Sequence, residues 1–155
     1  MKAVRMVKAG EPLQVEEIPI PVLGDKDIIV GVRAAGICHS DAHYRAGRST
    51  MGMLPITLGH EVAGVVEKTG ASVTNVKVGE RVALHYNISC GDCYQCSSGN
   101  DQFCTNVKMI GHHVDGGYAE YIAVPARNAI PLPDEISFEA GATLMCASAT
   151  SLHAL

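Results

Sequence analysis

The sequence predicts a mainly β-structured domain with a few helices, folded as a barrel or a sandwich of sheets. The 155 residues, 47% of them hydrophobic, fit the usual size of one domain with its own core. Short segments rich in Val and Ile recur between Gly and Pro residues, which is typical of strands joined by turns. Several segments alternate apolar and polar residues, and this alternation gives a sheet one solvated face.

Six segments carry the strand pattern, and two carry a helical one. The predicted strands are residues 2–7, 13–18, 27–35, 61–69, 81–85 and 118–124. A helix is predicted at residues 39–47, with Ser40 or Asp41 as its N-cap, and a second one after the cap Ser137. The second helix reaches Leu155 without a Gly or Pro stop, so we expect the chain to be cut there. The region 86–106 shows neither helical nor strand periodicity, and a loop of that length needs a cross-link to hold its structure.

Composition excludes several classes of protein. A net charge of −4 offers no basic face, so a nucleic-acid partner is not expected. No apolar run approaches the roughly 18 residues of a membrane span, and the start lacks the apolar core of a secretory signal. The cytoplasm is therefore the expected location. Cysteines stay reduced there, so clustered cysteines favour a metal site over disulfides.

Four cysteines within one loop form the first candidate site. Cys90, Cys93, Cys96 and Cys104 follow the spacing C-x2-C-x2-C-x7-C, and four thiolates complete a closed tetrahedral zinc site. Such a site has no position open to substrate, so its role would be to fold the loop. An iron–sulfur cluster is the competing interpretation, because ferredoxin-type loops begin the same way. Here, however, the fourth cysteine comes after seven residues and precedes Thr105 instead of Pro. Disulfides or free thiols are the remaining alternative.

The other two cysteines belong to a second candidate site. Cys38, His60, Glu61 and Cys146 all carry good zinc ligands. Taken alone, each residue has a simpler explanation. A lone cysteine is usually a small buried hydrophobic residue, and a lone histidine is more often a hydrogen-bonded polar residue than a ligand. Together, Cys38, His60 and Cys146 would leave a fourth metal position open for water or substrate, as in a catalytic zinc site.

The motifs "GICHSDAHYRAG" and "LPITLGHEVAG", followed by the four-cysteine loop, resemble the zinc-containing medium-chain alcohol dehydrogenases. The opening "MKAVRM", the strand "DGGYAEYIAVP" and the closing "TSLHAL" extend this resemblance over the whole chain. It implies the GroES-like catalytic domain, a partly open β-barrel. It also implies two zinc ions, one structural and one catalytic, with Glu61 as a conditional ligand of the catalytic one.

The resemblance further assigns roles to residues 39–43. Asp41 matches the carboxylate that orients the zinc-bound histidine. Ser40 and His43 match the proton relay, and both would also contact the cofactor. His39 would either line the site or contact a cofactor phosphate.

The implied activity is reversible oxidation of a primary or secondary alcohol to an aldehyde or ketone, with hydride transfer to NAD(P). The chain lacks the G-x-G-x-x-G turn of a Rossmann domain. We therefore expect residues 1–155 to be the zinc-binding catalytic domain, with 147–155 starting the connection to a nucleotide domain. This chain alone would be inactive, and the complete enzyme would be a homo-oligomer. Polyol or threonine dehydrogenases share the scaffold, and a zinc-stabilised, non-catalytic binding module is the alternative from another class.

Overall fold

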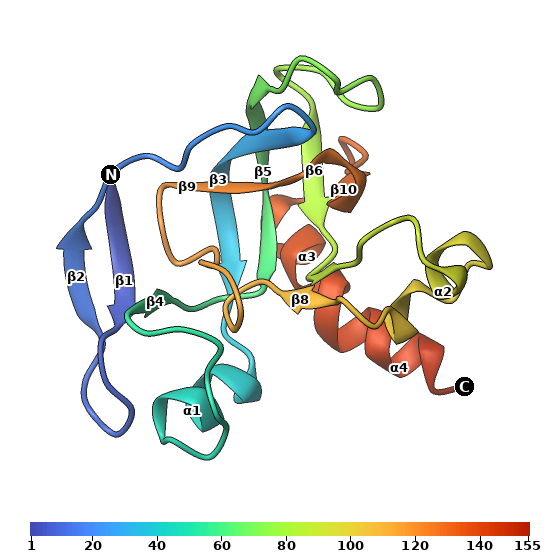
Figure 1. The fold of residues 1–155 in the computed structure, drawn as a ribbon. Helices are drawn as coiled ribbons and strands as arrows, with labels where there is room; N and C mark the ends of the chain where they lie inside the picture. Colours follow the sequence, from blue (N-terminus) through green and yellow to red (C-terminus); the bar gives the residue numbers. More distant parts are fainter.

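Three sheets form the body of the protein, as a computed structural model of residues 1–155 shows (Figure 1). The largest sheet has the order β10-β6-β5-β3-β9, formed by Ala129–Pro131, Arg81–Leu84, Glu61–Thr69, Asp27–Gly36 and Tyr121–Pro125. A second sheet has the order β2-β1-β4, formed by Gln14–Glu17, Lys2–Met6 and Ile56–Thr57. A short ribbon pairs β7, Asn87–Ile88, with β8, Lys108–Met109. The mainly β architecture predicted from the sequence is confirmed.

All strand pairs are antiparallel, and the core lies against the five-stranded sheet. Strand β3 is central to this core, because it pairs with β5 on one side and β9 on the other. Its residues Ile28 and Val30 are fully buried with branched side chains from β5, β6 and β9. An isolated antiparallel β-bridge between Ala3 and Ala119 joins the two larger sheets.

All six predicted strands occur, and the bounds of five of them differ little from the prediction. The strand predicted at residues 118–124 starts later, because β9 begins only at Tyr121. The preceding segment instead runs beside residues 57–59, where Gly116, Gly117 and Tyr118 donate backbone hydrogen bonds to Thr57, Gly59 and Leu58. Strands β4, β7, β8 and β10 were missed because each has only two or three residues, too few to show a period of two.

The first helix, α1, spans His39–Arg45, and its N-cap is Cys38. The prediction of Ser40 or Asp41 as the cap is therefore wrong. Asp41 sits in the first turn, where its carboxylate reaches back and accepts a 3.0 Å hydrogen bond from the Cys38 backbone N–H. This satisfies a free donor at the helix start and places Cys38 at the junction of β3 and α1.

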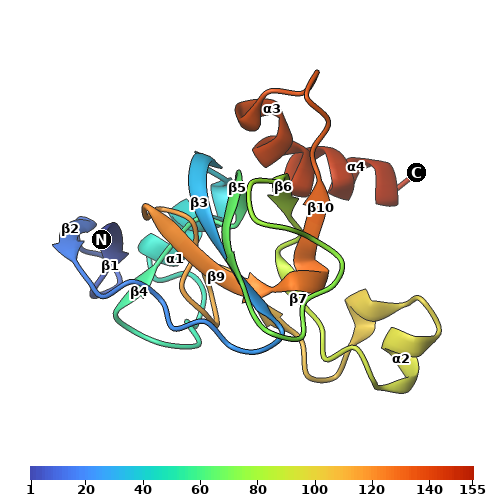
Figure 2. The ribbon, with the colours of Figure 1, turned by 90° about the horizontal axis from the view of Figure 1, so that it is seen from above.

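The C-terminal helix begins after Ser137, whose hydroxyl accepts a hydrogen bond from the Ala140 N–H, as predicted. It continues through α3 (Phe138–Thr143), a π-helical stretch (Leu144–Ser148) and α4 (Ala149–His153). Helix α3 lies along the five-stranded sheet (Figure 2), where Ala142 packs on Ala63 and Ala83. None of the helices has both the length and the apolar character needed to cross a bilayer.

The region 86–106 forms a lobe that projects from the sheets (Figure 2). It is less irregular than expected, because it contains β7, the short helix α2 (Tyr94–Ser97) and a 3₁₀ turn (Asp101–Phe103). Its side chains contribute little to the core, and Tyr94 and Phe103 are exposed. The lobe therefore depends on local interactions rather than on burial.

Candidate metal centres

The four predicted loop cysteines lie together in this lobe. Their sulfur atoms are all within 4.8 Å of one another. The separations are 3.5 Å for Cys93–Cys96 and Cys90–Cys104, and 3.8 Å for Cys90–Cys96. A tetrahedral site with Zn–S bonds of about 2.3 Å has sulfur atoms about 3.8 Å apart. The sulfur atoms therefore already have the spacing that one zinc ion requires.

Local hydrogen bonds favour thiolate character in this cluster. Backbone N–H groups of Cys90 and Asn106 each donate to the Cys104 sulfur at 3.4 Å, and they lower the pKa of Cys104. The Cys96 backbone N–H likewise lowers the pKa of Cys93, to about 7. By contrast, Asp92 raises the pKa of Cys90 to about 12, because its carboxylate accepts a hydrogen bond from the thiol and so conflicts with loss of the thiol proton. A divalent cation would remove that conflict.

Cys38, His60, Glu61 and Cys146 form a second group, with ligand atoms within 4.8 Å of one another. The sulfur atoms of Cys38 and Cys146 are 3.9 Å apart, again close to the spacing of a tetrahedral zinc site. His60 and Glu61 are buried, whereas the two cysteines are partly exposed. Buried ligands on one side and accessible ones on the other suit a metal that remains open to a small molecule.

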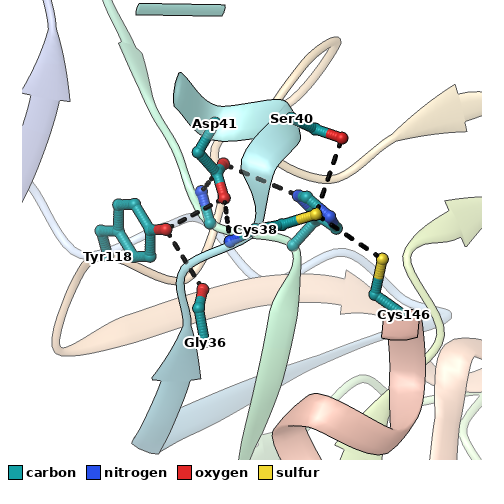
Figure 3. Close-up of polar contacts among 8 residues, drawn as sticks. Gly36, Cys38, Ser40, Asp41, Tyr118 and Cys146 are labelled. Carbon is teal, nitrogen blue, oxygen red and sulfur yellow. Dashed lines mark hydrogen bonds and ion pairs between the residues drawn. The ribbon is translucent and has the colours of Figure 1, made fainter. Parts of the chain in front are cut away.

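Different elements bring these ligands together. Cys38 follows β3, and His60 directly precedes β5. Gly59, with a φ of +92°, makes the turn that aims His60 inward. Cys146 lies in the π-helical stretch, and Figure 3 shows its side chain reaching from this helix toward Cys38. An extra residue in a helical turn shifts the side chains after it, and such π-bulges are frequent at functional sites.

Asp41 is next to His60, and Figure 3 shows it on the side of Cys38 away from Cys146. Its Oδ1 atom is 3.6 Å from His60 Nδ1 and accepts a 3.2 Å hydrogen bond from the Gly59 N–H. Its Oδ2 atom accepts from the Cys38 N–H at 3.0 Å and from the Tyr118 hydroxyl at 3.0 Å. With Nδ1 facing a carboxylate, the other ring nitrogen of His60 is the one free to bind a metal.

Burial and mutual contacts shift the pKa values of this group. Burial alone would raise the pKa of Asp41, but its contacts with His60 and Cys38 outweigh burial and lower it. Burial opposes the charged form of His60 as well, yet Asp41 raises the pKa of that imidazole. Burial and the neighbouring Cys38 thiol raise the pKa of Cys146 to about 12. Two thiolates side by side are unfavourable without a cation between them.

The other predicted residues lie on α1. The Ser40 hydroxyl is 3.6 Å from the Cys38 sulfur, so it borders the second cluster. The rings of His39 and His43 stack with centroids 4.6 Å apart, and His39 is exposed. The structure shows no direct hydrogen bond between Ser40 and His43, so a proton would pass between them through another group.

Sequence reasoning missed two tyrosines and a glycine. The Tyr118 hydroxyl contacts Asp41, and the Tyr86 ring meets His60 edge-on with centroids 5.6 Å apart. Gly36 lies where a Cβ atom would overlap the Glu61 carboxylate. The one sequence signal for any of the three is that Tyr118 directly follows the "DGG" turn, which fixes the backbone before it. Nothing in the sequence connects Tyr86 or Gly36 with a ligand.

These antiparallel sheets, with two groups of side chains that could each hold a metal ion, can be compared with known protein families. The model of the "Alcohol dehydrogenase GroES-like domain" family matches residues 24–134, and the chain belongs to that family. The predicted resemblance and GroES-like fold are thereby confirmed.

Three relatives illustrate the range of the family. An NAD-dependent alcohol dehydrogenase of Sulfurisphaera tokodaii is 37% identical over all of this chain and 47% of its own. An L-threonine 3-dehydrogenase of Symbiobacterium thermophilum is 41% identical over 90% of this chain and 40% of its own. A cobalt- and zinc-bound alcohol dehydrogenase of Pyrobaculum aerophilum superposes with a TM-score of 0.87 at 35% identity, covering 94% of this chain and 44% of its own. The chain thus spans about half the length of the curated relatives it matches.

Proposed function

We propose that this chain is the zinc-binding catalytic domain of an NAD(P)-dependent alcohol dehydrogenase. The observation that carries the proposal is the second cluster, in which Cys38, His60 and Cys146 converge from three separate elements. The proposal assigns the catalytic zinc to these three ligands, with Glu61 as an alternative fourth. It assigns a structural zinc to the four-cysteine lobe, whose sulfur spacing supports that role.

Zinc bound at the second cluster would act as a Lewis acid and ease loss of the hydroxyl proton from an alcohol. Ser40 is the residue suited to accept that proton, because its hydroxyl both accepts and donates and lies beside Cys38. His43 is partly exposed on the same helix and would pass the proton to solvent. Asp41 keeps the His60 ring oriented while this happens.

NAD(P) would accept the hydride on a nucleotide domain outside these residues, as the greater length of the relatives suggests. Residues 147–155 would begin the connection to it, and His39 would face the cofactor side. We further propose a homo-oligomeric, cytoplasmic enzyme that binds neither nucleic acid nor membranes.

The substrate would be a primary or secondary alcohol, or the aldehyde or ketone in the reverse direction. The relative from Symbiobacterium makes an amino alcohol such as threonine the second candidate, because it is at least as similar as the alcohol dehydrogenase. A panel of simple alcohols, polyols and L-threonine, each with NAD and NADP, separates these substrates in the full natural protein. Absence of any turnover, together with two bound zinc ions, would instead support a non-catalytic zinc-stabilised binding module.

The proton-transfer role is tested with Ser40→Ala in the full natural protein. Loss of a positioned acid–base group lowers a rate by roughly 10²–10⁴-fold, so kcat should fall by about that factor. The zinc content should not change, because the Ser40 hydroxyl is outside the proposed ligand set. Equal loss of zinc and of rate would show that Ser40 is structural and would contradict the relay. Ser98→Ala, on the exposed lobe, is the matched control.

A further inference from the structure

Tyr118 touches both of the turns that carry ligands of the second cluster. Its hydroxyl is 3.0 Å from Asp41 Oδ2 and 3.1 Å from the carbonyl oxygen of Gly36, near the end of β3 that leads to Cys38. Its ring covers Gly59, the residue before His60, so closely that a Cβ atom at Gly59 would overlap it. Figure 3 shows Tyr118 on the far side of Asp41 from the cysteines. The side chain therefore contacts the surroundings of two ligands without reaching either.

The backbone around Tyr118 fixes this arrangement. The Tyr118 N–H donates to Leu58 O at 3.0 Å, and the Tyr118 carbonyl accepts from the Val4 N–H at 2.7 Å. The neighbouring Gly117 donates to Gly59 O at 2.8 Å. A Cβ atom at Gly117 would overlap the side chain of Val62, so the close approach of this segment depends on glycine. The tyrosine thus projects from a segment that is bonded to two others.

The hydroxyl has one proton and two possible acceptors. A carboxylate is the stronger acceptor, because hydrogen bonds to an ionised group are about twice as strong as neutral ones. Asp41 is 4% exposed, and a buried carboxylate needs all the donors it can obtain. The Cys38 N–H and Tyr118 occupy Oδ2, which leaves Oδ1 for Gly59 and His60. Without the Tyr118 donor, the Cys38 and Gly59 N–H groups would still bind the carboxylate, but its orientation toward His60 would be less firmly fixed.

We propose that Tyr118 is a positioning residue for the metal at Cys38, His60 and Cys146, acting through Asp41. This inference rests on the proposed function, since it assumes that these three residues bind the metal. Tyr118 does not touch the metal or the substrate. It holds the carboxylate that orients His60, and partners of this kind typically change metal affinity by about 10–100-fold.

The test is Tyr118→Phe in the full natural protein, which keeps the ring over Gly59 and removes only the hydroxyl. Zinc release to a coloured chelator should show two phases, and His60→Ala identifies the phase that belongs to the second cluster. In Tyr118→Phe that phase should be about 10-fold faster or more, while the phase of the four-cysteine lobe is unchanged. The cobalt-substituted variant should also show shifted visible bands for this site, because its ligand geometry relaxes.

Two further variants keep the result specific. Tyr121→Phe removes a hydroxyl from β9, outside the hydrogen bonds of Asp41, and should leave both phases unchanged. In an Asp41→Asn background, Tyr118→Phe should have little further effect, because the carboxylate through which Tyr118 would act on His60 is already gone. Unchanged release in Tyr118→Phe, or full additivity with Asp41→Asn, overturns the inference.

A different measurement, the metal content of His60→Ala, tests the proposed function itself. If His60→Ala removes no metal from the protein, the ligand assignment itself is wrong. If His60→Ala does remove one metal and Tyr118→Phe alters nothing, only the role of Tyr118 is lost.

Discussion

The two cysteine groups present similar ligands, but they are built in opposite ways. Cys90, Cys93, Cys96 and Cys104 come from one lobe, and backbone N–H groups of that same lobe bond to their sulfur atoms. The second group spans residues 38–146, and its ligands come from the end of β3, the start of β5 and the C-terminal helix. The first group has little hydrophobic support, whereas the second adjoins the main sheet and has two buried members.

Under the proposed function, this difference separates a metal that stabilises a fold from a metal that takes part in chemistry. If both groups bind zinc as proposed, the lobe would depend on its metal, because a region without a core gains its folding free energy from metal binding. A site on the main sheet receives its geometry from packing that exists without the metal. We therefore expect the two sites to respond in opposite ways to loss of a ligand.

Cys146→Ala should give the largest effect on activity. Removal of one thiolate disrupts a Lewis acid that supplies several kcal/mol of transition-state stabilisation, so kcat/KM should fall by about 10⁴-fold in the full natural protein. The melting temperature should change little, because Cys146 lies on the partly exposed face of the helix. Steady-state kinetics, zinc analysis and thermal unfolding of one preparation check this. A large loss of stability would show that the second site is structural too.

Cys104→Ala should give the largest effect on stability. Cys104 is the buried member of the lobe cluster, and loss of the metal there should cost roughly 3–5 kcal/mol. At roughly 2–4 °C per kcal/mol, the melting temperature should fall by about 10 °C. Hydrogen exchange should show the loss of protection confined to the lobe. Protection lost equally throughout β3 and β5 would contradict the independence of the lobe.

Gly36→Ala tests how far the second site depends on backbone packing. The added Cβ atom would overlap the Glu61 carboxylate, and overpacking of this kind costs about 1–3 kcal/mol. The displaced carboxylate should alter metal binding at the second site and leave the lobe metal in place. Ala35→Gly, at the preceding position of β3, is the control for a change in strand propensity. Unaltered metal release in Gly36→Ala would show that Glu61 has room to move.

The smallest effect concerns pH in the metal-free protein. The pKa of Asp41 is lowered from 3.8, so its contribution to stability is present above that value and is lost as pH falls through the lowered pKa. The pKa of His60 is raised from 6.5, so its contribution is present below that value and is lost as pH rises through the raised pKa. Asp41 and His60 together should therefore stabilise the metal-free protein most between about pH 4 and 6.5.

Urea unfolding from well below about pH 4 to well above pH 6.5 measures the effect, and Asp41→Asn should flatten the dependence. A dependence that persists in Asp41→Asn would assign the effect to other groups. With zinc bound, His60 cannot take up a proton at its ligating nitrogen, so the decline at higher pH should disappear.

The longer strands, the two longer helices and the lobe cysteines were predictable from the sequence, because each of these is a local pattern. The Val-rich segment at residues 61–69 predicted β5 with its observed bounds, and Ser137 predicted the start of the last helix. Spacing alone singled out the four lobe cysteines, since ligands a few residues apart converge through local turns. The grouping of Cys38 and His60 with Cys146 needed a family resemblance, because no local signal joins residues so far apart.

The surroundings of that second group depend on tertiary packing and could not be predicted. The cap at Cys38, the π-helical turn around Cys146 and the contact from Tyr118 to Asp41 all depend on segments distant in sequence. Asp41 was expected as a possible helix cap, yet its carboxylate is fixed by Gly59 and Tyr118 as well as by Cys38. A buried carboxylate takes its donors from whichever backbone and side chains surround it, and those neighbours are set by packing of the whole domain.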